Sequence, residues 1–126
     1  MLSAIGTANE KEIEKRIYES IFKELSTEHH PKIYIDDEVE ALKVYSDYYT
    51  KVASCSDAEI VIMTTTDISS ECQNKIVFGT RYRHLKQPYV TGAFFWQKGR
   101  PNIVFKEDQL HKHEITLSAS MNEFVE

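Results

Sequence analysis

Two continuous apolar runs constrain the fold of this 126-residue chain more than any other feature. Residues 59–63 and 75–79 each contain three or more consecutive apolar side chains without a polar residue between them. A strand that is covered on one face only alternates apolar and polar residues, so these runs predict strands buried on both faces, as in a parallel sheet. Helical stretches separate the predicted strands. We therefore expect one α/β domain over residues 1–126, with a small, doubly wound, mostly parallel sheet flanked by helices.

A C-terminal antiparallel ribbon is predicted next to this sheet. Residues 89–105 contain the only tryptophan and the densest aromatic run of the chain, arranged as strand, tight turn and strand. Residues 98–101 form the predicted turn, because glycine permits a positive φ and proline cannot donate to a central ladder. Phe94, Phe95 and Trp96 are adjacent, so both ribbon faces carry an aromatic ring. Phe95 would be exposed unless the terminal helix or a partner covers it.

An amphipathic helix over residues 9–25 is the clearest helical pattern, with apolar residues on one stripe. Residues 1–8 are expected to be disordered or the remnant of a processed N-terminal segment. The other predicted elements are shorter: a strand at 32–35, a helix at 38–49, an edge strand at 51–54, a turn at 55–57, a helical turn at 68–72, a polar connection at 80–86, a helix ending at 113, an extended stretch at 115–117, and a last helical turn capped by Ser118 or Ser120.

Charge is distributed unevenly along the chain. The net charge of −5 argues against a nucleic-acid partner. Residues 73–113 nevertheless hold eight of the 15 Lys and Arg residues and only two of the 20 Asp and Glu residues. This basic part is either a solvated surface or a site for an anion or an acidic partner.

Basic side chains follow the second buried strand, which makes them the main candidates for binding. Four of them lie between residues 81 and 86, and two more lie at the ribbon turn. If the first group opens at the carboxyl end of the sheet, several guanidinium groups would converge on a carboxylate or phosphate. The alternative is a solvated basic loop. The candidate set for a ligand or partner is Arg81, Arg83, His84, Lys98, Arg100 and Trp96.

The other groups that carry chemistry are weaker candidates. Asp36 and Asp37 follow a predicted strand, where an acidic pair could bind Mg²⁺, although a solvated turn or a helix start is the favoured interpretation. No histidine or cysteine spacing predicts a metal site, and no glycine-rich or nucleophile motif is present, so we expect neither cofactor nor enzymatic activity. Cys55 and Cys72 are either two free thiols or a disulfide.

The order of these elements resembles the YfiR-like family of small periplasmic regulators. The resemblance is strongest in the last third: residues 92–105 are similar to that family's glycine-led hairpin, and residues 108–110 and 115–120 are similar to its two closing helices. Fewer cysteines and a more aromatic, more basic hairpin distinguish this chain. The resemblance implies export to the periplasm, no catalysis, and control of a membrane-bound diguanylate cyclase by protein contact.

Two functions from different classes remain open at this point. The first is a non-enzymatic periplasmic regulatory or sensor domain that acts on a membrane-bound signalling protein. The second is a binding module for a small anionic ligand, which a pocket beyond Asp36 and Thr64 would favour. The cytoplasm is the alternative location, and a homodimer is left open.

Overall fold

One mixed sheet forms the centre of the structure within residues 2–36 and 48–126, which the computed structural model describes with side chains from residue 10 onward. Its six strands have the order β2-β1-β3-β4-β5-β6. All neighbours are parallel except β5 and β6, which are antiparallel. The α/β class, the mostly parallel sheet and the C-terminal ribbon are thereby confirmed. The strands are β1 (Lys32–Ile35), β2 (Thr50–Lys51), β3 (Ile60–Met63), β4 (Ile76–Gly79), β5 (Val90–Gln97) and β6 (Arg100–Phe105).

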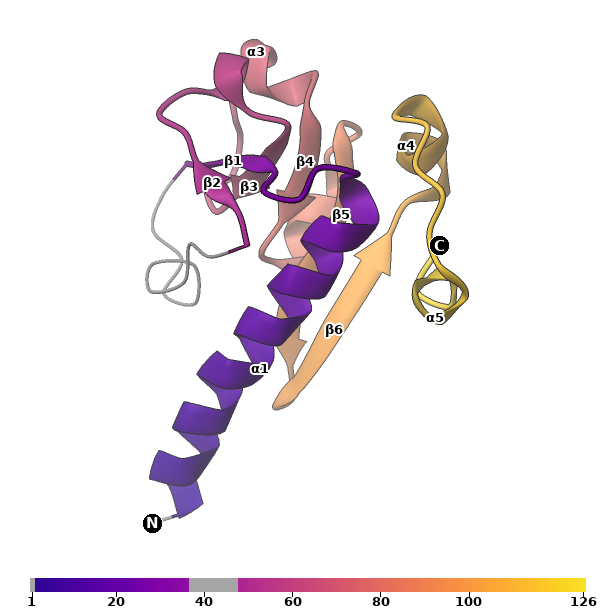
Figure 1. Ribbon diagram of the computed structural model, residues 1–126. Helices are drawn as coiled ribbons and strands as arrows, with labels where there is room; N and C mark the ends of the chain where they lie inside the picture. The colour runs from indigo at the N-terminus through magenta and orange to yellow at the C-terminus, as the bar shows by residue number, and fades with distance from the viewer. Residues whose placement is uncertain (1, 37–47) are drawn as a thin grey trace.

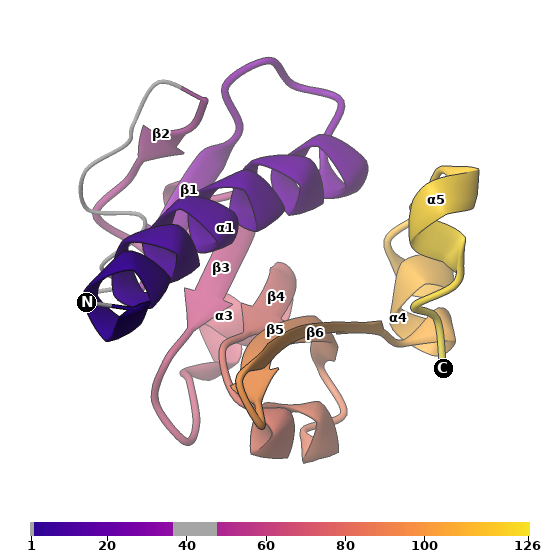
Figure 2. The same ribbon diagram turned by 90° about the horizontal axis from the view of Figure 1, so that it is seen from below.

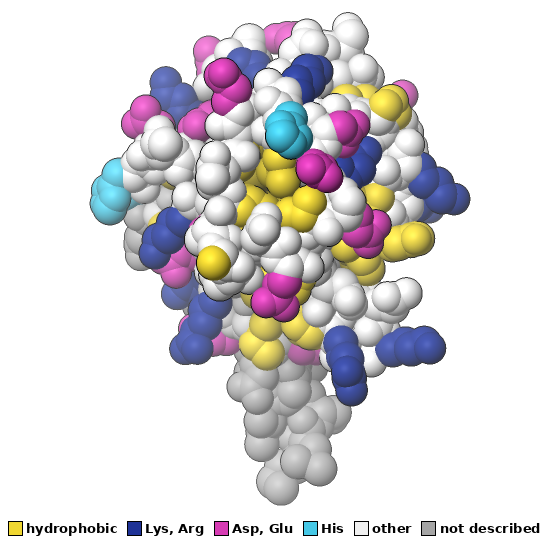
Figure 3. Space-filling model, turned by 90° about the vertical axis from the view of Figure 1, so that its right-hand side faces the viewer, with side chains coloured by type: hydrophobic (Ala, Val, Ile, Leu, Met, Phe, Trp, Pro, Cys, Tyr) yellow, Lys and Arg dark blue, Asp and Glu magenta, His cyan; other side chains and the backbone are white. Residues whose placement is uncertain are grey.

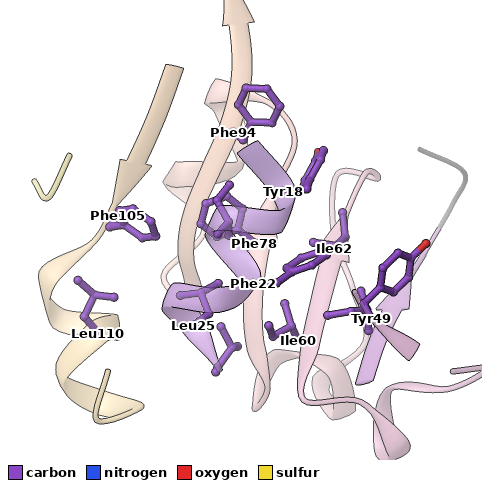
Figure 4. Close-up of a cluster of buried hydrophobic side chains, with 13 residues drawn as sticks. Tyr18, Phe22, Leu25, Tyr49, Ile60, Ile62, Phe78, Phe94, Phe105 and Leu110 are labelled. Atoms are coloured by element: carbon purple, nitrogen blue, oxygen red, sulfur yellow. The ribbon is translucent and has the colours of Figure 1, made fainter. Parts of the chain in front are cut away.

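Helix α1 (Leu2–Leu25) lies across one face of the sheet (Figures 1 and 2). It begins at Leu2 rather than at Asn9, so residues 2–8, for which we expected either disorder or a processed remnant, are helical. The apolar stripe of α1 packs on the inner side chains of five strands, β1 and β3–β6 (Figure 4). The most deeply buried members of this core are Ile21, Phe22, Ile33, Ile60, Ile62, Phe78 and Phe105, each at most 1% exposed.

Short elements cover the opposite face. They are η1 (Cys55–Asp57), α3 (Ser70–Gln73) and η2 (Tyr82–Lys86), which pack on Val61, Met63 and Val77. All residues of β3 and β4 are buried, because both faces of these strands are covered. The continuous apolar runs therefore reflect two-sided burial, as predicted. Cys55 and Cys72 form a disulfide that joins η1 to α3, with 5.1 Å between the two Cα atoms.

A two-residue turn connects β5 to β6. Lys98 and Gly99 have φ values of 52° and 75°, as in the type I′ turn that suits the twist of a hairpin. The predicted four-residue turn was too long, since Arg100 and Pro101 are already part of β6. Proline is tolerated there because β6 is an edge strand.

The C-terminal segment lies beyond the end of β6 (Figure 1). It forms α4 (Glu107–Lys112) and α5 (Ala119–Asn122), and Ser118 is the residue before α5. The last residues then run parallel to the end of β6: Phe105 N–H donates to the carbonyl of Phe124 at 2.9 Å, and Glu126 N–H donates to the carbonyl of Phe105 at 2.8 Å.

Two other predicted elements differ from the structure. The edge strand is Thr50–Lys51, not residues 51–54. Most of the predicted helix at 38–49 lies outside the described residues, and Tyr48 and Tyr49 are not helical. Among the described helices, none combines the length and apolarity that a membrane span requires.

Candidate functional site

A pocket of about 730 Å³ opens at the carboxyl ends of β3 and β4. Three parts of the chain line it: Glu14 and Tyr18 of α1, residues 80–83 after β4, and residues 94–97 in the far half of β5. Thr64, the first residue after β3, also lines the pocket. The position agrees with the general location of ligand sites in open α/β sheets, which lie outside the carboxyl ends of the strands.

Aromatic side chains make up most of the walls. On the α1 side, the rings of Tyr18 and Phe94 form a T-shaped contact with centroids 5.3 Å apart, and the centroid of Phe94 lies 6.1 Å from that of Trp96. On the other side, Tyr82 meets Phe95 at 5.5 Å. Phe95 is consequently only 7% exposed. The ring of Tyr82 packs on Phe95 and shields it from solvent. We expected the terminal helix or a partner to do so, and neither is needed.

Tyr82 is the most exposed large apolar side chain among the described residues, with 61% of its surface accessible. It stands between Arg81 and Arg83, whose side chains are exposed. The ion pairs recorded among the described residues involve neither arginine. The pocket therefore combines aromatic walls with two guanidinium groups that have no carboxylate partner among the described residues.

Glu14 is the only acidic residue among the described lining residues. One of its carboxylate oxygens, Oε1, accepts a 2.5 Å hydrogen bond from Nε1 of Trp96. This bond links α1 to the far half of β5 and fixes the indole in the pocket wall. Burial, together with the nearby charge of Glu14, raises the pKa of Tyr18, so this phenol stays neutral.

His84, one of the predicted binding residues, lies beneath the loop rather than in the pocket. It is 2% exposed, and its Nδ1 accepts hydrogen bonds from the backbone N–H groups of Thr80 at 3.0 Å and Arg81 at 3.3 Å. Burial lowers the pKa of His84, which favours the neutral imidazole that can accept these bonds. His84 thus positions Arg81 instead of meeting a ligand.

Gly79 makes this arrangement sterically possible. A Cβ atom at Gly79 would lie 2.6 Å from the Cβ of His84, well inside contact distance. The imidazole can therefore fold back against the end of β4 only because position 79 lacks a side chain. The loop that carries the two pocket arginines depends on this close approach.

Asp36 caps the end of β3 and is not free to bind a metal. Its carboxylate accepts hydrogen bonds from the backbone N–H and hydroxyl groups of Thr64 and Thr65 over 2.5–3.3 Å. Asp37, its predicted partner in an acidic pair, lies outside the described residues. Within the described parts of the chain, no group of three or more His, Cys, Asp or Glu side chains could hold a metal ion.

Lys98 and Arg100 do not join the arginines of the pocket. They lie at the hairpin tip, where they line a separate shallow hollow with Gln97 and Asn102. Of the six predicted binding residues, the structure brings only Arg81, Arg83 and Trp96 into the pocket. The sequence analysis missed Glu14 and Tyr18, which looked like ordinary helix residues, and Tyr82, whose ring in a polar loop was an available signal.

A second hollow of about 630 Å³ lies between α4 and α5. Figure 3 faces the side of the molecule that carries these helices and shows apolar side chains gathered at its centre, with acidic side chains and a histidine beside them. The lining includes Leu110, Ile115, Leu117 and Val125, together with Glu107 and His111. Neither lysine nor arginine is among its described lining residues, so it lacks the guanidinium groups of the first pocket.

Comparison with known proteins returns no relative. No protein-family model, no curated protein and no solved structure matches this chain.

Proposed function

We propose that this domain is a non-enzymatic regulator that acts by contact with a protein partner, and that the pocket beside Tyr82 is its recognition site. One observation carries the proposal: a highly exposed tyrosine at the mouth of an aromatic pocket stands between two arginines that form no ion pair within the described parts of the chain. Tyrosine, tryptophan and arginine are the residue types enriched at the energetic centres of protein interfaces.

The compartment and the class of partner are proposed from other features. A buried disulfide suits an oxidising compartment, and the resemblance to the YfiR-like family favours the periplasm. A membrane-bound diguanylate cyclase is then the class of signalling protein that the domain would hold in check. In the pocket, Glu14 serves to fix Trp96, which leaves the walls suited to recognition rather than to proton transfer.

The test uses charge reversal in the pocket. Arg81→Glu/Arg83→Glu is compared with Lys86→Glu/Lys112→Glu, a pair of exposed residues outside the pocket that changes the net charge equally. We expect the wild-type chain and the control to retain the same membrane protein from solubilised membranes of the native cell. The pocket variant should retain about ten-fold less of that protein. Thermal unfolding should stay unchanged, because exposed side chains contribute little to stability.

Equal retention by the pocket variant would contradict the proposal. An unfolded pocket variant would also contradict it, because these exposed arginines would then be structural residues. Circular dichroism of both variants separates the two results.

A small anionic ligand is the second candidate, and the size of the pocket favours it. A volume of about 730 Å³ falls within the range of roughly 300–1,000 Å³ of small-molecule sites. Trp96 is the only tryptophan and lies in the wall, so its fluorescence reports on occupancy. Saturable changes with succinate or inorganic phosphate that disappear in Arg81→Glu/Arg83→Glu would support this candidate.

A further inference from the structure

We infer that the partner enters this pocket as an extended acidic segment that pairs with the free edge of β5. The inference rests on the proposed function and deepens it by naming the form and charge of the partner. It starts from a mismatch between two neighbouring strands. The pairing of β4 with β5 ends at Gly79 and Ala93, but β5 continues through Gln97.

The pocket occupies the space into which a longer β4 would extend. Residues 94–97 of β5 line it on one side, and residues 80–83, where the chain leaves β4, line it on another. Four residues of a strand span about 13 Å at ~3.3 Å per residue. A short extended segment therefore fits beside β5 as a strand.

Backbone groups of β5 point toward this space. Residues of an antiparallel pair alternate between those that bond to each other and those whose N–H and C=O groups point outward. Gly92 of β5 lies opposite Phe105 of β6. The backbone N–H and C=O of Phe105 bond to residues 124 and 126, on the side away from β5. The Gly92–Phe105 pair is therefore one whose N–H and C=O groups point outward from the ribbon. By alternation, the Trp96–Pro101 pair is also outward. The N–H and C=O of Trp96 hence face the pocket, beyond Gly79–Ala93, the last pair that β4 forms with β5.

The two walls suit the side chains of a strand. Successive side chains of a strand point to opposite faces. One set would contact Tyr18 and Phe94 on the α1 side, and the other would contact Tyr82 and Phe95. Strand addition of this kind draws its affinity from main-chain hydrogen bonds and its specificity from such side-chain contacts.

Charge identifies the segment as acidic. Arg81 and Arg83 have no carboxylate partner among the described residues, and the planar guanidinium binds carboxylates in a bidentate manner. Glu14 is already bonded to Trp96. Aspartate or glutamate side chains at the ends of the segment would meet both arginines.

Selection from a random heptapeptide library on the 126-residue, disulfide-bonded chain tests this inference. We expect enriched peptides with an apolar centre and an acidic residue toward each end. Their fluorescein conjugates should bind the Arg81→Glu/Arg83→Glu variant at least ten-fold more weakly than the wild type, and the Lys86→Glu/Lys112→Glu control as tightly as the wild type. N-methylation of alternate peptide amides should weaken binding at least ten-fold. Hydrogen exchange at the Trp96 amide should slow at least ten-fold when the peptide is bound.

Different failures separate the inference from the function on which it rests. One outcome is that peptide binding requires the two arginines while N-methylation leaves the affinity unchanged and the bound peptide leaves the exchange rate of the Trp96 amide unchanged. In that case partners bind through side chains only, and strand pairing is wrong. A parallel selection uses the Arg81→Glu/Arg83→Glu variant as bait. If the wild-type bait enriches no peptide beyond those that the variant enriches, the proposed protein contact is wrong as well. If the free chain is a dimer with a protected Trp96 amide, the occupant is a second copy and the inference falls.

Discussion

Replacing Phe22 with alanine is expected to lower the free energy of unfolding by about 3–5 kcal/mol, the usual cost of emptying a buried phenylalanine site. Phe22 is 1% exposed and lies between α1 and the sheet (Figure 4). Its ring contacts Tyr18, Tyr48 and Tyr49 at centroid distances of 5.8–6.0 Å. Tyr48 and Tyr49 lie outside α1, and Tyr18 is one helical turn away and packed on Phe94, so these neighbours cannot collapse fully into the cavity. Urea unfolding followed by circular dichroism measures the loss.

Ile13→Ala is the matched control for Phe22→Ala. Ile13 lies on the same helix but is 38% exposed, so its truncation should cost less than about 1 kcal/mol. A loss at Phe22 no larger than the loss at Ile13 would mean that α1 does not pack on the sheet as described.

Loss of the disulfide is expected to lower the free energy of unfolding by about 3 kcal/mol. Cys55 and Cys72 are 17 residues apart, and the bond restricts the unfolded chain over that loop. Both residues are buried, so Cys55→Ala/Cys72→Ala is the suitable variant. Urea unfolding of this variant and of the wild type, with and without a reductant, measures the difference.

The reductant supplies an internal control for the disulfide. It should destabilise the wild type and leave Cys55→Ala/Cys72→Ala unchanged. Two free thiols in the native protein, detected by alkylation and mass spectrometry under oxidising conditions, would contradict the pairing.

The sheet was predictable because its signals are local. The continuous apolar runs in β3 and β4 record burial on two faces, and Gly99 marks the turn of the hairpin. Each of these signals depends on residues that are neighbours in sequence. Element boundaries were less accurate, since Arg100 and Pro101 fit a turn and an edge strand equally well.

The pocket was only partly predictable because it depends on how distant segments meet. Arg81 and Arg83 were identified from charge, yet Tyr18 and Glu14 reach the same pocket from a helix more than 60 residues earlier. His84 looked like a binding residue, and only the fold reveals that its imidazole turns inward against Gly79. Nothing in the local sequence distinguishes a buried imidazole from an exposed one.

Site-specific photo-crosslinking tests the central claim most directly, namely that the pocket at the carboxyl ends of β3 and β4 is where a partner binds. A benzophenone amino acid replaces Tyr82 at the mouth of the pocket or Lys112 in α4, outside it, and the chain is irradiated in its native cell. We predict one specific adduct with a membrane protein from position 82, its loss when Arg81→Glu and Arg83→Glu are added, and no such adduct from position 112. The same adducts from both positions, or an adduct from position 82 that persists after charge reversal, would contradict the account.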